Sequence, residues 1–152
     1  MKERIYATWP ARPTANGQSI ILVSNADKTA NGAVSPTPST TTALGDVDLI
    51  DITFHDIDQA SAANGLRAYA SPDGGTTWYE TDLKSDNDAA TVGSAQPRQV
   101  PALTSGQEWR ETFVVSHLKC WAIEFTAGAT PPGASHWAGT IALHRGVVSV
   151  RR

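Results

Sequence analysis

The side chains that could bind a metal are few and scattered along the chain. The four histidines are His55, His117, His136 and His144. No two of them stand at the H-x-H or H-x-x-x-H spacing with which one element presents two ligands to a metal. Around His55 the residue pattern places Asp56 and Asp58 on the opposite face of the segment, which separates these groups. The sequence therefore predicts structural or surface histidines and no metal site.

Acidic side chains are the next candidates for chemistry. Asp82, Asp86 and Asp88 lie close together beside Asn87, and their oxygens could bind calcium. The spacing of an EF-hand loop and the bidentate glutamate at its end are missing, so we expect a solvated acidic loop.

Other carboxylates fall on predicted strands. They are Glu80, Glu108, Glu111 and Glu124. Two of them could flank a cleft, so a small hydrolase with a carboxylate pair stays open as an alternative.

Nucleophile motifs are missing from the sequence. Neither G-x-S-x-G nor a protease-like cysteine motif occurs. The single cysteine, Cys120, lies between Lys119 and Trp121 on a predicted strand, where we expect it to serve as a small packing residue. We expect a protein that is not an enzyme, needs no cofactor and is stabilised by packing without a disulfide.

Charge and hydropathy narrow the classes of partner. Of the 152 residues 18% are charged, and the net charge is −3. The twelve Lys and Arg residues are scattered except for Arg151 and Arg152, which argues against nucleic acid. No apolar run has the length of a signal peptide core or of a membrane span. We therefore expect neither a nucleic-acid nor a membrane partner, and a protein that stays in the cell that makes it.

The elements that must position these side chains are strands. Helical periodicity is absent, and alternation with period two recurs, as in Ile50, Ile52 and Phe54 on one face. The pattern predicts strands over 19–23, 47–57, 66–70, 78–81, 109–115, 121–125, 137–144 and 147–150. About eight strands with long loops predict a single all-β domain, a two-sheet sandwich of the jelly-roll kind.

Three polar segments interrupt the strands, over 26–44, 83–99 and 127–135. The first two exceed the ~12–15 residues usual for loops in compact domains, so we expect them to form contact surfaces. Residues 1–17 lack a strand pattern and are expected to form an extended N-terminal arm outside a sandwich domain of residues 18–152.

The stretch 71–78 reads SPDGGTTW and matches S-x-D-x-G-x-T-W. It resembles the Asp-box hairpin of sialidases and other carbohydrate-active or surface proteins. Asp73 can accept backbone N–H groups inside the turn, and Gly74 and Gly75 allow a positive φ. The structural hairpin residues are predicted to be Ser71, Asp73, Gly75, Thr77 and Trp78. The motif occurs once, without an arginine triad or a Tyr–Glu pair, so it does not imply a sialidase.

The tryptophans raise the question of a binding platform, because exposed aromatic rings stack on sugars or pack at interfaces. Trp78, Trp121 and Trp137 alternate with apolar neighbours and are predicted to lie in the core. Trp9 is followed by a polar segment, and we expect it to be exposed or packed on a partner. Trp9, Pro10 and Pro13 are the candidate partner contacts.

The run 66–146 resembles small structural proteins of tailed bacteriophages, through the stretches 66–78, 108–113 and 125–132. The resemblance implies a virion structural protein, assembled in the host cytoplasm. Jelly-roll decoration or cement proteins of this class form dimers or trimers and bridge subunits of the major capsid protein. Their partners are thus the major capsid protein or other virion proteins. The arm 1–17 would then be a strap across a neighbour, whose deletion leaves the domain folded but abolishes particle binding.

Two other functions stay open beside decoration. One is a glycan- or receptor-binding module of a phage tail or fibre, with exposed aromatic rings around one end of the sandwich. The other is the small carboxylate-dependent hydrolase. Head, neck and tail locations are equally compatible with the sequence.

Overall fold

The regular structure of the described residues consists of nine strands and one short helix. The computed structural model describes residues 3–7, 9–26, 28–30, 47–55, 64–81, 98–100, 103, 106–116, 118–128, 131 and 133–146. The strands are β1 (Glu3–Ala7), β2 (Ser19–Ser24), β3 (Leu49–His55), β4 (Asn64–Ser71), β5 (Tyr79–Thr81), β6 (Arg98–Val100), β7 (Glu108–Val114), β8 (Cys120–Thr126) and β9 (Ala138–Arg145). A single 3₁₀ turn, η1 (Ala134–His136), precedes β9.

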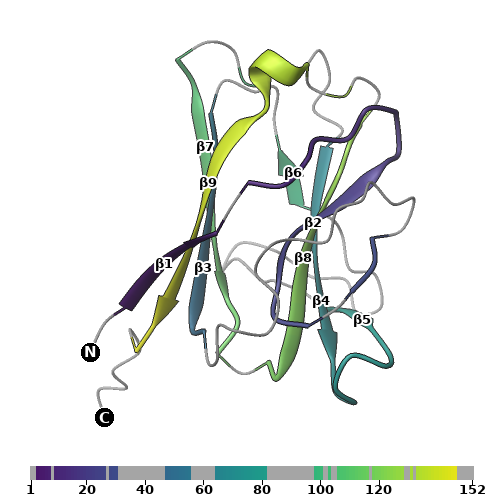
Figure 1. Ribbon diagram of the computed structural model, residues 1–152, viewed down its shortest axis with the longest axis vertical. Coiled ribbons are helices and arrows are strands. Elements are labelled where there is room, and N and C mark those ends of the chain that lie inside the picture. Colours follow the sequence, from purple (N-terminus) through teal and green to yellow (C-terminus); the bar gives the residue numbers. More distant parts are fainter. Residues whose placement is uncertain are drawn as a thin grey trace.

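The strands form two antiparallel sheets that face each other (Figure 1). Sheet A has the order β1-β9-β3-β7. Sheet B has the order β2-β8-β4-β5, and β6 also pairs with β4. The expected all-β, two-sheet sandwich is therefore confirmed.

The core lies between the sheets and follows from the alternation in the sequence. In β3, Ile50, Ile52 and Phe54 are 0% exposed, and the residues between them point to the outer face of sheet A. From the other side β8 contributes Trp121 and Phe125, at 1% and 0% exposure. Because each sheet buries one face, a shift of one residue in any central pairing would expose these side chains.

Strands that are neighbours in space come from distant parts of the chain. β9 lies between β1 and β3, and β8 lies between β2 and β4 (Figure 1). From β1 to β4, and again from β7 to β9, consecutive strands fall in opposite sheets. Each sheet therefore contains strands from both halves of the chain.

Two observed strands have no counterpart among the predicted ones. β6 has three residues, and β1 has five, of which Ile5 and Ala7 pack against the core. Such short segments carry too few alternating positions to be recognised by pattern. The predicted strand over 147–150 and most of the long loops over 26–44 and 83–99 lie outside the described residues.

The described part of the expected N-terminal arm belongs to the sandwich, which corrects the boundary drawn at residue 17. β1 pairs with β9 from Glu3↔Arg145 to Ala7↔Ile141, and Pro13 is buried. The pairing with β9 supplies backbone hydrogen bonds that the local sequence pattern does not reveal.

None of the described helical segments is long and apolar enough to span a membrane.

Candidate functional site

The outer face of sheet A carries a group of polar side chains from four strands, which we call the Asp51 cluster. Its members are Arg4 on β1, Asp51 on β3, Arg110 and Thr112 on β7, and His144 on β9. The register places Asp51 opposite Thr112 on one side and Ala142 on the other. Period-two alternation turns all of these residues away from the core, which brings them to one patch of solvent-facing sheet.

Asp51 is the centre of the cluster. Thr112 Oγ1 donates to Asp51 Oδ1 at 2.5 Å, and Arg110 Nη2 donates to Oδ2 at 2.9 Å. His144 Nε2 lies 2.9 Å from the same Oδ2, and Arg4 Nη2 lies 3.9 Å from it. The Asp51 side chain is 12% exposed, whereas those of Arg4 and Arg110 are 48% and 53% exposed. The carboxylate thus lies beneath a layer of basic groups that still face the solvent.

The hydrogen bonds keep Asp51 ionised. Burial by itself raises the pKa of Asp51, but hydrogen bonds from Thr112, His144 and Arg110, with the charge of Arg110, hold its pKa below the usual 3.8. Both carboxylate oxygens are engaged, so this group is poorly placed to abstract a proton from a substrate. The arrangement holds the side chains of Arg110 and His144 in place on the outer face of sheet A.

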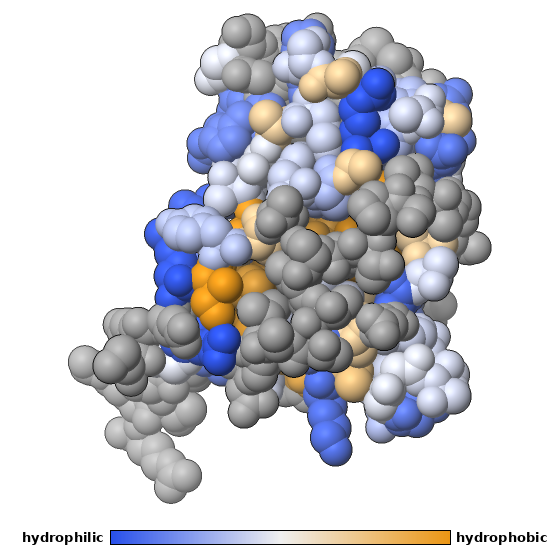
Figure 2. Space-filling model, in the orientation of Figure 1, coloured by the Kyte–Doolittle hydropathy of each residue, from blue (hydrophilic) through white to orange (hydrophobic). Residues whose placement is uncertain are grey.

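Exposed apolar side chains lie on the same face. Among the described residues, the large hydrophobic side chains with most exposure are Tyr6 at 61%, Tyr79 at 59% and Val114 at 51%. Tyr6 and Val114 belong to sheet A, and Arg4 Nη1 donates to the Tyr6 hydroxyl at 3.3 Å. Tyrosine and arginine are enriched in protein interfaces. Figure 2 looks at the edge of the sandwich where β1 runs, and there hydrophobic atoms lie next to hydrophilic ones.

The second group of candidates is the hairpin between β4 and β5. Asp73 Oδ1 accepts from the backbone N–H of Thr77 at 2.7 Å and from Ser71 Oγ at 2.8 Å. The N–H of Gly75 donates to Ser71 Oγ at 2.8 Å, and Gly75 has a φ of 101°. Trp78 Nε1 donates to the Gly75 carbonyl oxygen at 3.0 Å. The structure thus brings the five predicted hairpin residues together.

The electrostatics of the hairpin follow from these bonds. The Thr77 backbone N–H, with the hydroxyls of Thr77 and Ser71, lowers the pKa of Asp73 to about 2. Asp73 is therefore ionised throughout the physiological range, and its acceptor sites are used inside the turn. Trp78 packs on the outer face of sheet B against Ile21, Ala30 and Ala122 and is partly buried, outside the main core in which it was expected.

A cluster of three polar side chains, Tyr69, Glu124 and Lys28, lies on the outer face of sheet B. Tyr69 donates from its hydroxyl to Glu124 Oε1 at 3.2 Å, and Lys28 Nζ lies 3.8 Å from Glu124 Oε2. The Lys28 ammonium also lies 4.0 Å from the centre of the Tyr69 ring. Burial, followed by the charge of Glu124, raises the pKa of Tyr69 to about 12. Glu124 is only 2% exposed, so this carboxylate is closed to the solvent.

The four glutamates considered for a hydrolase do not all come together, although Glu80 and Glu124 both lie near Tyr69, whose pKa the charge of each raises. Glu80 pairs with Arg67 at 3.1 Å on sheet B, the sheet that also carries Glu124. Glu108 and Glu111 are on β7 of sheet A, on alternate faces of that strand. The structure therefore divides the set between the two sheets.

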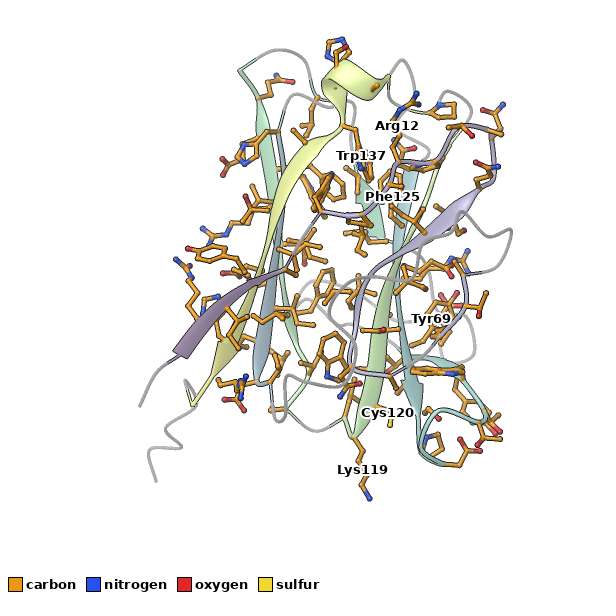
Figure 3. The ribbon with its side chains drawn as sticks, in the orientation of Figure 1. Arg12, Tyr69, Lys119, Cys120, Phe125 and Trp137 are labelled. Carbon is orange, nitrogen blue, oxygen red and sulfur yellow. The ribbon has the colours of Figure 1, made fainter. Side chains whose placement is uncertain are left out.

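One end of the sandwich is rich in aromatic rings. The Trp9 ring is 5.1 Å from that of Phe54 and 5.2 Å from that of Trp137, measured between centroids. Phe54 also contacts Trp109, and Trp137 contacts Phe125, near the end where η1 lies (Figure 3). The three tryptophans are partly buried and pack against the core.

Trp9, predicted to be exposed or packed on a partner, thus packs within its own domain. Pro10, another predicted partner contact, accepts a hydrogen bond on its carbonyl oxygen from Trp137 Nε1 at 2.9 Å. Pro13 is buried. The three arm residues are held by contacts inside the sandwich, because β1 fixes the start of the segment against β9.

The remaining histidines and the cysteine are dispersed. His55 Nδ1 lies 3.3 Å from Glu108 Oε2, His136 is exposed in η1, and His117 lies outside the described residues. Within the described ranges no three His, Cys, Asp or Glu side chains are grouped so as to hold a metal. Cys120, a free thiol, is half-buried at the start of β8, and the acidic loop 82–88 is outside the described residues.

Sequence reasoning missed the Asp51 cluster. Its members are up to 140 residues apart, since Arg4 and His144 face each other across β1 and β9. A usable signal was present in the sequence: polar or charged residues at alternate positions of otherwise apolar strands.

No family model, curated protein or solved structure matches this chain. What the structure shows is the fold, an all-β sandwich of two antiparallel sheets whose sheet A carries a polar cluster on its outer face.

Proposed function

We propose that this chain is a non-enzymatic structural protein of a virion, a decoration or cement protein that bridges subunits of the major capsid protein. The observation that carries the proposal is the Asp51 cluster. It uses a buried carboxylate to hold half-exposed arginines on a sheet face whose two edge strands also carry Tyr6 and Val114. Such a surface favours contact with another protein, and the resemblance of residues 66–146 to tailed-phage proteins indicates which class of protein.

The strand order supports the jelly-roll part of the proposal. Winding a jelly roll places consecutive strands in opposite sheets and sets the last strand beside the first. Here β1 pairs with β9, and β2 pairs with β8. These two pairings are those expected of a jelly roll, the fold that the resemblance to phage decoration proteins implies.

The contact surface in this proposal differs from the strap expected from the sequence. Because β1 and Trp9 are used inside the sandwich, the N-terminal arm is not free to lie across a neighbour. We assign capsid contact to the outer face of sheet A instead. Each copy then contributes a modest area, and particle symmetry multiplies the effect.

Density-gradient sedimentation of the native protein from its producing cells tests the proposal. We expect antibody detection to find the chain in a fast fraction with large assemblies, and its copy number per particle to separate capsid from neck or tail. Recovery only as a slow free species would overturn the virion assignment.

A pair of variants then tests the surface. Val114→Asp places an unpaired charge on the outer face of sheet A at a side chain that is 51% exposed. Lys119→Asp changes an exposed residue in the turn before β8 and serves as the control. We expect Val114→Asp to reduce particle occupancy while Lys119→Asp does not, with circular dichroism showing that both fold. Equal occupancy of both variants would remove sheet A from the proposal.

The aromatic end of the sandwich favours a second candidate, a glycan- or receptor-binding module of a tail or fibre. Trp9, Trp109 and Trp137 gather there around Phe54 and are only partly buried. Partly exposed tryptophan rings can stack on sugar rings. Titration of tryptophan fluorescence with a panel of oligosaccharides tests this function, since saturable quenching that is lost in Trp109→Ala would support it.

A further inference from the structure

Among the described strands, the edges of the two sheets differ in how well they resist pairing with another chain. Proteins protect edge strands with bulges, with short length or with charges that would face like charges. β2 carries a register shift between Ile21 and Val23, and β5 and β6 have three residues each. These edges of sheet B are therefore poor templates for a further strand.

Sheet A has two longer edges, β7 and β1. If two copies of β7 paired antiparallel about the strand centre, Glu111 would face Glu111 of the other copy. Like charges directly opposite each other destabilise a strand pair, so β7 resists self-pairing.

β1 behaves in the opposite way, because its sequence is self-complementary about Ile5. In an antiparallel pair of two β1 strands centred there, Arg4 of each copy faces Tyr6 of the other. Facing residues of this kind have Cβ atoms about 4.5–5.5 Å apart, close enough for a guanidinium to stack on a phenol ring. Within one copy Arg4 already lies 5.7 Å from the centre of the Tyr6 ring, and both side chains are about half exposed or more.

The backbone of β1 could also form hydrogen bonds with a further strand. β1 pairs in continuous register with β9 alone among the described strands, and it contains neither Gly nor Pro (Figure 1). Alternate N–H and C=O groups of an edge strand point away from its sheet. Ile5 is partly buried at this edge, and a second sheet laid beside it would cover it further.

We propose that the β1 edge is a homodimer interface, in which two copies join sheet A to sheet A across a two-fold axis at Ile5. The occupant is a second copy of this chain, recognised by backbone hydrogen bonds and two symmetric Arg4–Tyr6 contacts. Asp51, 3.9 Å from Arg4, offsets the positive charge that the two copies bring together. The interface is isologous, so it closes at two copies.

The dimer is weak. Five residues from each copy form a contact well below the ~1,600 Å² typical of stable complexes, so association depends on concentration. This proposal does not depend on the proposed virion function. The dimer is measured on the isolated full chain, whereas capsid contact is measured on particles, so either can fail alone.

Sedimentation velocity over a concentration series tests the dimer. We expect the full chain to shift from monomer to dimer as concentration rises. Tyr6→Lys puts a lysine opposite Arg4 in both symmetric contacts and should raise the Kd about tenfold, whereas Tyr6→Glu should leave it unchanged or lower it. Tyr79→Lys, at a similarly exposed tyrosine on β5, is the matched control and should have no effect. A wild type that stays monomeric at its highest soluble concentration, or a Tyr6→Lys variant that dimerises as wild type, would overturn the proposal.

Cysteine cross-linking tests the register. In a Cys120→Ser background, Arg4→Cys and Tyr6→Cys chains are oxidised separately and as an equimolar mixture. Position 4 faces position 6 of the other copy, while 4 and 4 lie diagonally at about 7–8 Å. We expect disulfide dimers chiefly in the mixture, identified as heterodimers by mass spectrometry. Cross-linking of either variant alone at the yield of the mixture would refute the Ile5-centred pairing.

Discussion

Replacing Trp9 by alanine is the clearest test of whether the N-terminal segment is part of the fold. The Trp9 ring contacts the rings of Phe54 and Trp137, and Gly139 lies so close that a Cβ there would be 2.6 Å from the indole. A free strap would lose nothing when this side chain is removed. A structural element would lose its packing.

The expected magnitude follows from the burial of Trp9. Removing a fully buried Phe or Trp side chain costs about 3–5 kcal/mol. Trp9 is partly buried, so we expect about 2–3 kcal/mol, including the loss of two aromatic pairs worth about 0.5–1.5 kcal/mol each. For a chain of this size that loss lowers the Tm by about 5–10 °C.

Far-UV circular dichroism during urea and thermal unfolding measures the change without relying on tryptophan fluorescence. Trp9→Phe keeps a ring against Phe54 and should lose less than Trp9→Ala. Tyr79→Ala removes an exposed aromatic side chain and should stay within about 0.5 kcal/mol of wild type. If Trp9→Ala were as stable as Tyr79→Ala, Trp9 would not hold the N-terminal segment in place. That result would favour the extended strap expected from the sequence.

Three further predictions concern charge and close packing. Asp51→Asn should cost about 1–3 kcal/mol at pH 7, because it loses charge-assisted hydrogen bonds. Since the pKa of Asp51 is lowered on folding, its contribution is present above the unfolded pKa of about 3.9 and is lost as pH falls. In urea unfolding, the difference in the free energy of unfolding between Asp51→Asn and wild type should therefore be smaller at pH 3 than at pH 7. An equal difference at the two pH values would contradict the role of Asp51. Tyr69, with a pKa of about 12, should give an absorbance change near pH 12, and its contribution to stability should be lost as pH rises from about 10 to 12. Glu124→Gln should lower the pKa of Tyr69, though burial keeps it above 10, and an unshifted titration would contradict the contact. Gly139→Ala would drive a Cβ into the carbonyl oxygen of Thr53, so thermal melts should show a loss of about 1–3 kcal/mol or more, and wild-type stability would contradict the close approach.

The hairpin shows how much local sequence can predict. Ser71, Asp73 and Gly75 lie within five residues, and the hydrogen bonds that join them are local. Such contacts need no distant partner, so their types and spacing suffice. The same holds for β3 and β8, whose alternating apolar residues predicted the strands and the faces that they turn to the main core. The pattern did not predict that Ala122 and Glu124, on the other face of β8, are buried as well.

The Asp51 cluster shows where the prediction stops. Asp51, Arg110 and His144 come from three strands, and their meeting depends on which strands are neighbours and in which register. A single sequence contains the alternation that turns each residue outward, but it does not contain the pairing. Which strands pair, and in which register, is decided by the burial of the inner faces of both sheets in one core.

The sequence by itself determined an all-β chain, most of its strands, its buried faces and its tight hairpin, because these follow from period-two alternation and from turn chemistry within a few residues. Only the tertiary structure decided that Glu3–Ala7 is an edge strand of sheet A and that Trp9 packs inward. It also decided that a carboxylate and three basic groups share one face. The physical reason is that strand pairing joins segments more than a hundred residues apart, as in β1 with β9, and is fixed by the whole core.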